Sequence, residues 1–140
     1  MKGLHNLIRV HKWKLDEKRR ELADFEDMRT GFVARLHKLD EELRQEVDVT
    51  GKDPELGFAF ANYAAAAKLQ RENICVSIKD VEEKIAALND ELAECFQELK
   101  KYEIALETRL TREKYMRDRA EQMSIDDMAI ELHRRKSAPL

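Results

Sequence analysis

Four histidines, two cysteines and 29 acidic side chains are the groups of this chain that could bind a metal or catalyse a reaction. The histidines are scattered without metal-ligand spacing, and no H-E-x-x-H, C-x-x-C, P-loop or G-x-G-x-x-G motif occurs. Paired carboxylates act as acid and base only where a cleft separates their pKa values. Whether these groups can do chemistry therefore depends on the elements that position them.

A seven-residue repeat of apolar side chains runs through the first third of the chain, and such a repeat predicts a coiled-coil helix. Its a positions are Ile8, Leu15, Leu22, Arg29, Leu36 and Leu43, and its d positions are Leu4, His11, Lys18, Phe25, Phe32, Leu39 and Glu46. We interpret Lys18 and Arg29 as register-setting residues whose aliphatic stems pack in the seam. His11 is interpreted as a polar core residue and not as a ligand.

A second repeat follows without a polar interruption and predicts the partner helix. Its members alternate steps of four and three residues: Ile74, Ile78, Val81, Ile85, Leu88, Leu92, Cys95, Leu99, Tyr102 and Leu106. Cys95 falls inside this run, so we expect it to be a small core hydrophobe without a redox or metal role. Two cysteines make no disulfide framework in a chain of this length.

The segment between the two runs has the composition of a turn. Gly51 suits the left-handed residue after a helix C-terminus. Asp53 followed by Pro54 suits an N-cap and a proline at the first helical position. A connection this short makes neighbouring helices antiparallel.

We therefore predict an all-α fold: a long antiparallel two-helix coiled-coil hairpin with a longer, overhanging C-terminal helix, forming a single domain over residues 1–140. Helix one is expected at about 4–48, the turn at about 49–54 and helix two at about 55–135. A two-helix hairpin has no cleft in which paired carboxylates could be desolvated. We expect no enzyme, no metal and no cofactor.

Two registers of the hairpin, one heptad apart, fit the repeats equally well, with Leu43 opposite either Phe60 or Ala67. Both lay a basic stretch at 9–20 near an acidic stretch at 80–98. Ion pairs at a wet surface contribute only a few tenths of a kcal/mol each, so their use is to set orientation and register. The first register makes these pairs possible: Lys14–Glu91, Glu21–Lys84 and Arg19–Glu82.

The composition excludes several classes of protein. The net charge of -3 argues against a dedicated nucleic-acid binder, which would be basic. No apolar run approaches the roughly 18 residues of a membrane span, and the first residues lack the apolar core of a secretory signal. We expect a reduced, cytoplasmic protein, monomeric or homodimeric.

The last part of helix two, from about residue 107, has no partner within the hairpin. It keeps a broken apolar stripe among arginines, and Ser124 with Asp127 has the form of a capping box that could start a new helical segment. One interpretation is a frayed, solvated tail. The other is a helix that docks on a partner or on a second copy, because methionine and leucine give adaptable apolar contacts. Whether it is ordered when free stays open.

Trp13 is the only tryptophan and falls at position f of the first repeat, on the side facing away from helix two. Isolated exposed apolar side chains are normal, but tryptophan is enriched at interfaces. We expect Trp13 to contact a partner, and it and the overhang could face the same one.

Four strings give the chain a resemblance to the flagellar export protein family FliJ, in its alpha-proteobacterial form. They are LIRVHKWKLDEKRRELADFEDM at 7–28, ANYAAAAKLQRENI at 61–74, ELKKYEIALE at 98–107 and SIDDMAIELHRR at 124–135. The strings centred on Tyr63 and on Asp126 to Ala129 are more specific than the heptads.

The resemblance implies a cytoplasmic, non-enzymatic stalk of the flagellar type III export apparatus, at the cytoplasmic face of the basal body, with a role in motility and chemotaxis. Such a stalk inserts into the hexameric export ATPase ring, promotes its assembly and activity, contacts the cytoplasmic domain of the export gate and escorts substrate-specific chaperones. The implied ring-facing residues are Leu110, Met116, Met123, Met128, Leu132, Arg109, Arg112 and Arg117, together with Trp13. The implied gate-facing residues are Phe60, Tyr63 and Leu69.

The gate assignment meets one departure from the family pattern, because this chain has Ala64 to Ala67 where many members carry an aromatic residue a turn after the tyrosine. Two other functions fit the same residues. One is a homodimeric coiled-coil scaffold in which two overhangs pair. The other is the equivalent stalk of a type III secretion injectisome.

Overall fold

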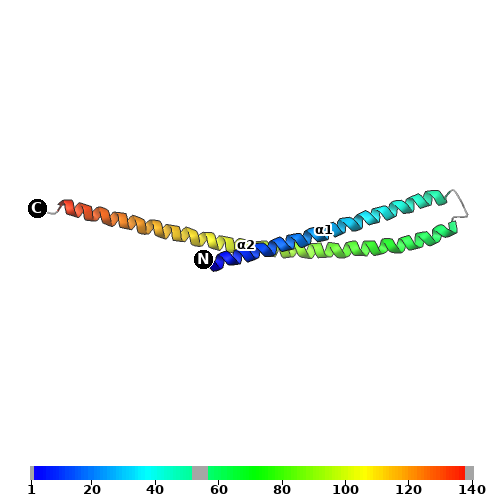
Figure 1. Cartoon of the computed structure of the whole chain (residues 1–140), viewed down its shortest axis with the longest axis horizontal. Helices are drawn as coiled ribbons and strands as arrows, with labels where there is room; N and C mark the ends of the chain where they lie inside the picture. The colour runs from blue at the N-terminus through cyan, green and yellow to red at the C-terminus, as the bar shows by residue number, and fades with distance from the viewer. Residues whose placement is uncertain (1, 52–56, 138–140) are drawn as a thin grey trace. The chain divides into compact units, whose positions relative to one another are not determined.

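The computed structural model describes residues 2–51 and 57–137, and both stretches are helical. Helix α1 spans Lys2–Thr50 and α2 spans Gly57–Ser137 (Figure 1). The chain has two prolines, at 54 and 139, and both lie outside these helices, so no missing N–H interrupts either hydrogen-bond ladder. The two long helices pack against each other. The prediction of an all-α helical hairpin is confirmed.

Helix α1 continues to Thr50, slightly beyond the end expected at about 48. The left-handed conformation expected for Gly51 is wrong, because no glycine of the described residues has a positive φ. The Gly51 amide instead donates to the Val47 carbonyl over 3.0 Å, the spacing of an ordinary α-helical bond. The expected cap at Asp53 and Pro54 lies outside the described residues.

Residues 13–96 form one compact unit, in which the two helices run antiparallel. Ala67, Ile74, Val81 and Leu88, each seven residues from the next, are all at most 5 % exposed. Strict seven-residue spacing keeps one line of side chains turned toward the neighbouring helix. Near the loop end, Leu39 of α1 is buried with Ala67 and Ile74, and partly buried side chains surround them: Phe32, Leu36, Leu43 and Ile78.

Leu43 packs on the cluster that holds Ala67, so the hairpin has the second of the two possible registers. Three ion pairs between the helices fit this register. Their donor–acceptor distances are 2.7 Å for Lys18–Glu91, 2.9 Å for Arg29–Glu82 and 2.9 Å for Arg71–Asp40.

The pairs expected for the first register are wrong, since the shift by one heptad brings other side chains together. Glu91 accepts from Lys18 and Glu82 accepts from Arg29. The ammonium of Lys84 lies 5.9 Å from the centre of the Phe25 ring, a cation–π distance.

Lys18 and Arg29 have the geometry expected of polar residues beside a seam. Lys18 is the better covered, with 29 % of its side chain exposed, and its charged end reaches Glu91 at the surface. The hydrogen bond to Glu91 raises the pKa of Lys18. The hydrogen bond to Asp40 likewise raises the pKa of Arg71. Lys18 and Arg71 therefore stay charged in the ion pairs that fit this register.

The second unit joins residues 2–12 of α1 with residues 97–137 of α2. Ile8 and Leu99 are buried in it. The rings of His11 and Tyr102 stack with centroids 4.9 Å apart and planes 25° apart. His11 is thus a half-buried residue packed on an aromatic side chain.

The capping box at Ser124 is wrong as a helix start. Helix α2 continues from Gly57 to Ser137 without a break, so Ser124 and Asp127 lie in its interior. A cap needs a residue with non-helical dihedral angles before the first turn. In a helix that is already propagating, each further residue adds a hydrogen bond at lower cost than a new start.

Candidate functional site

The C-terminal stretch of α2, residues 107–137, is called the arm below. Every one of its residues is exposed. It contains no glycine or proline, and the carboxylate of Glu131 pairs with Arg135 one turn on, at 3.5 Å. Arg134, Arg135 and Lys136 lie in the last turn of α2, where basic side chains interact favourably with the helix dipole. Local interactions therefore support this helix without a second one.

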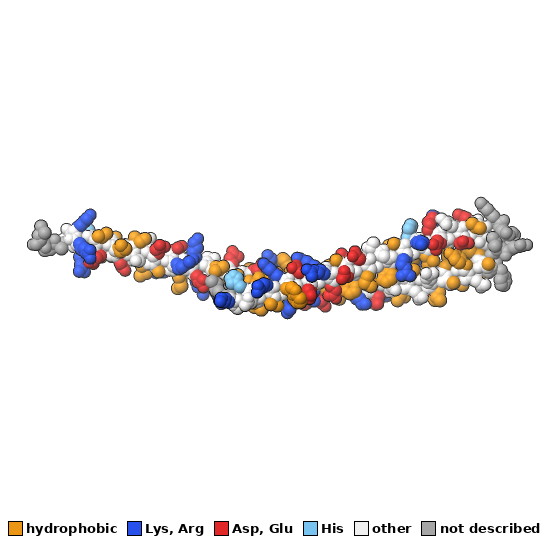
Figure 2. Space-filling view, in the orientation of Figure 1, with side chains coloured by type: hydrophobic (Ala, Val, Ile, Leu, Met, Phe, Trp, Pro, Cys, Tyr) orange, Lys and Arg blue, Asp and Glu red, His pale blue; other side chains and the backbone are white. Residues whose placement is uncertain are grey.

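The arm is unusually apolar for an uncovered helix, and Figure 2 shows apolar side chains on its surface. Its large apolar side chains are between 44 % and 65 % exposed. They are Leu110, Tyr115, Met116, Met123, Ile125, Met128, Ile130 and Leu132. A solvated helix gains nothing from such side chains, whereas an exposed apolar patch is typical of a protein interaction site.

The arm continues the buried line of the hairpin. Counting on by sevens from Leu88 passes the half-buried Cys95 and Tyr102 and the exposed Arg109. It then reaches three apolar residues, Met116, Met123 and Ile130. These three define the first apolar face of the arm, together with Ala120 between them. Ile130 is 65 % exposed and was not among the candidate residues found from the sequence. The seven-residue step from Met123 is the signal that could have found it.

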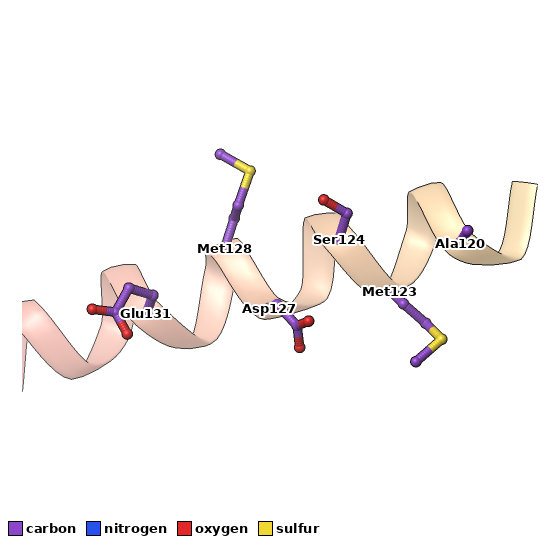
Figure 3. A pocket seen from close by; sticks show the side chains of 6 residues that line it. All are labelled: Ala120, Met123, Ser124, Asp127, Met128 and Glu131. Carbon is purple, nitrogen blue, oxygen red and sulfur yellow. The ribbon is translucent and has the colours of Figure 1, made fainter. Parts of the chain in front are cut away.

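A second apolar face lies on nearly the opposite side of the arm. Met128 is five residues from Met123, a rotation of about 140° around a helix with 3.6 residues per turn. Figure 3 shows the two methionines pointing to opposite sides of the ribbon, with Asp127 on the side of Met123. Ile125 and Leu132 fall on the Met128 side, since they lie three residues before and four residues after it.

The depression drawn in Figure 3 is open because one helix alone forms it. Its lining residues are Ala120, Met123, Ser124, Asp127, Met128 and Glu131. A small-molecule site needs walls on several sides to bury its ligand. The surface therefore suits a second helix or a protein groove, and not a small ligand.

The remaining ring-facing candidates are also exposed, but they lie in different parts of the chain. Arg109, Arg112 and Arg117 are on the arm. Trp13 is 59 % exposed and belongs to the unit of residues 13–96. The expectation that Trp13 faces away from helix two agrees with this exposure.

The gate-facing candidates lie at the beginning of α2. The rings of Phe60 and Tyr63 lie 6.5 Å apart between centroids, tilted by 38°. Leu69 is exposed, whereas Ala67, between it and the two rings in sequence, is buried beside Leu39. Ala67 thus has a structural reason, because a larger side chain at that position would not fit against α1.

Within the described residues, the His, Cys, Asp and Glu side chains do not come together in a metal site. No set of three His, Cys, Asp or Glu side chains in the described part of the chain could hold a metal ion. Cys75 and Cys95 are half-buried free thiols. Within the same residues no helix is long and apolar enough to cross a membrane.

Comparison with known proteins gives two similar curated sequences. The chain is 30 % identical over 98 residues to a protein named Flagellar FliJ protein from Caulobacter vibrioides strain NA1000 / CB15N, and the match covers 70 % of each chain. The protein of that name from strain ATCC 19089 / CIP 103742 / CB 15 matches with the same identity and coverage. No family model and no solved structure matches the chain.

Proposed function

The chain belongs to the FliJ family, and on that basis we propose that it is the stalk of the flagellar type III export ATPase. As a family member it is a flagellum-associated component of protein export and not an enzyme. The proposal adds a mechanism: the arm inserts into the hexameric ATPase ring, promotes its assembly and raises its rate of ATP hydrolysis.

The observation that carries this proposal is the pair of apolar faces on an uncovered helix. Figure 3 shows Met123 and Met128 on opposite sides of the arm. Met116, seven residues before Met123, falls on the Met123 side. A helix lying in a shallow groove needs one apolar face, whereas a helix surrounded by protein gains from two. Covering a methionine side chain contributes about 1.5–3 kcal/mol, so several together support specific binding.

The ring-facing residues of the proposal are those of the arm. The apolar ones are Leu110, Met116, Met123, Met128 and Leu132, to which the structure adds Ile130. Arg109, Arg112 and Arg117 would pair with acidic groups of the ring. Trp13 is a further contact on the other unit.

The beginning of α2 is proposed to contact the cytoplasmic domain of the export gate, through Phe60, Tyr63 and Leu69. Substrate-specific chaperones are proposed as further partners. These contacts would hold the protein at the cytoplasmic face of the basal body.

The test is ATP hydrolysis by the cognate export ATPase, titrated with the full chain and with a chain ending at Leu106. The full chain should stimulate hydrolysis and the shortened chain should not. Replacing Met116 and Met123 by serine should weaken the apparent affinity at least about tenfold, because two apolar contacts of more than 1 kcal/mol each are lost. Val76→Ser, at an exposed position of the other unit, is the control and should stimulate normally.

Equal stimulation by both chain lengths would move the contact away from the arm and leave Trp13 as the main candidate. Absence of stimulation by either would rule out the stalk. The same titration distinguishes the alternative of an injectisome stalk. In that case the chain would stimulate the ATPase of an injectisome and not the flagellar one.

A further inference from the structure

Residues 109–131 of the arm carry their charges in two blocks of opposite sign, and the basic last turn of α2 follows them. Residues 109–119, the basic block, have five basic side chains against two acidic ones, a net charge of +3. Residues 120–131, the acidic block, have four acidic side chains and no lysine or arginine. Such blocks are self-complementary when two copies run in opposite directions.

The first apolar face has nearly the same centre as the charge pattern. Ala120 lies at the boundary of the two blocks, with Met116 four residues before it and Met123 three residues after it. A two-fold axis passing near Ala120 would set Met116 against the Met123 of a second copy. The small side chain of Ala120 would let the two helices approach closely at that point.

We propose that the arm pairs antiparallel with the arm of a second copy of this chain, crossing near Ala120. The pairing covers the first apolar face and places each basic block beside the acidic block of the other copy. It also gives the seven-residue repeat of the arm a helix to pack against, which α1 does not provide there. This self-pairing goes beyond the stalk function and does not depend on it.

A parallel pair of arms is disfavoured by the same charges. It would set basic block against basic block and acidic against acidic, and like charges facing each other across a helix pair are destabilising. Antiparallel pairing converts these repulsions into attractions. The charges therefore determine the orientation, while the methionines contribute most of the stabilisation.

The contact between the two arms is short, so we expect the dimer to be weak. Residues 109–131 cover roughly 35 Å of helix at 1.5 Å per residue, or about three heptads. Short coiled coils associate weakly, so the pair should form and dissociate as the protein concentration changes. Because Met116 and Met123 are covered in the pair, a paired arm cannot offer them to another protein.

The test is the molar mass of the full chain by light scattering or sedimentation, from about 1 to several hundred micromolar, the range of a weak complex. The mass should rise from 16.4 kDa toward twice that value with concentration. Salt should lower the dimer fraction, because screening weakens pairs between exposed blocks.

Two charge-reversal variants identify the surface. The first makes the basic block acidic by Arg112→Glu, Lys114→Glu and Arg119→Glu. The second makes the acidic block basic by Glu121→Lys, Asp126→Lys and Glu131→Lys. Each variant alone should stay at monomer mass at concentrations where the original chain is dimeric. An equimolar mixture should return to dimer mass, since residues 109–131 then have a net negative charge in one arm and a net positive charge in the other.

The matched control carries the first variant's charge change outside the arm, by Arg9→Glu, Lys12→Glu and Lys14→Glu, and should dimerise as the original does. Helicity by circular dichroism checks that every variant is folded. Monomer mass for the original chain at all concentrations would overturn the proposal. So would dimers that survive both reversals, or folded variants whose mixture stays monomeric.

Discussion

Residues 67–96 and the arm are two parts of one helix, built on the same seven-residue spacing and differing in what covers them. In the first part, the spacing brings Ala67, Ile74, Val81 and Leu88 against α1 and buries them. In the arm, the same spacing leads to Met116, Met123 and Ile130, which solvent reaches. The pattern that folds the hairpin thus reappears in the arm on an exposed surface.

The choice of side chain also differs between the two parts. The covered part uses branched aliphatic residues and alanine, which have few rotamers and pack one fixed neighbour well. The first apolar face of the arm uses two methionines, whose flexible thioethers adapt to more than one surface. The difference supports the proposal that the first part keeps one partner, α1, whereas the arm meets exchangeable ones.

The largest effect should come from truncating a buried residue of the first part. Leu88→Ala removes a side chain that is 4 % exposed, and leaving a cavity there should lower the free energy of unfolding by about 2–4 kcal/mol. Met123→Ala on the arm should change it by less than about 0.5 kcal/mol. Urea denaturation followed by helicity, at a concentration where the chain is monomeric, measures both. Comparable losses would show that the arm is covered within one chain.

A smaller effect should come from enlarging an alanine of the buried line. Ala67→Leu forces extra atoms between α2 and Leu39, and overpacking of this kind costs about 1–3 kcal/mol. Its neighbour Ala66 is exposed, so Ala66→Leu should be neutral within about 0.5 kcal/mol. Thermal denaturation of the two variants compares a covered and an uncovered position at equal change in volume. A neutral Ala67→Leu would contradict the register described above.

The smallest effect should come from the ion pair of Lys18 with Glu91. Since the hydrogen bond to Glu91 raises the pKa of Lys18 above its ordinary 10.5, the pair stabilises the folded chain fully below that pH. Its contribution is lost as the pH rises through the higher pKa of the folded state. The difference in melting temperature between the original chain and Lys18→Gln should therefore shrink above pH 10.5.

Lys14→Gln is the control for this measurement, because it removes a neighbouring lysine and leaves the contact with Glu91 in place. A difference that shrinks equally for both variants would assign the effect to general charge and not to the pair.

The sequence predicts the fold well because the apolar seven-residue repeat extends over many turns of each helix. It leaves the register open, since both alignments set apolar side chains against apolar ones and keep the basic stretch near the acidic stretch. The contact of Leu43 with the Ala67 cluster is a matter of how side chains fit between two helices, which spacing alone does not contain.

Local signals misled at two places for one reason. Gly51 and Ser124 have the residue types of helix ends, but a type permits an end without requiring one. At Ser124, residues on both sides favour helix and the ladder continues through it. At Gly51, the amide keeps its bond to the carbonyl four residues earlier.

The candidate site was predictable as a surface but not as a set of partners. The composition of the arm allows a solvated tail or a docking helix, and the structure shows its apolar side chains, Met116 and Met128 among them, exposed on an unbroken helix. Ile130 was not predicted, because a helix start at Ser124 would interrupt the seven-residue step from Met123 to Ile130, and α2 has no such break. What covers the second face depends on the surface of another protein, which this chain does not encode.

Trp13 provides an intrinsic fluorescence probe of binding. It is the sole tryptophan, it is 59 % exposed, and it belongs to the unit of residues 13–96 and not to the arm. The intrinsic fluorescence of the chain therefore reports directly on what touches that one position. A partner covering Trp13 should shift its emission toward the blue, while one that grips only the arm should leave the spectrum nearly unchanged. Light from a single side chain can thus tell two binding events apart without any added label.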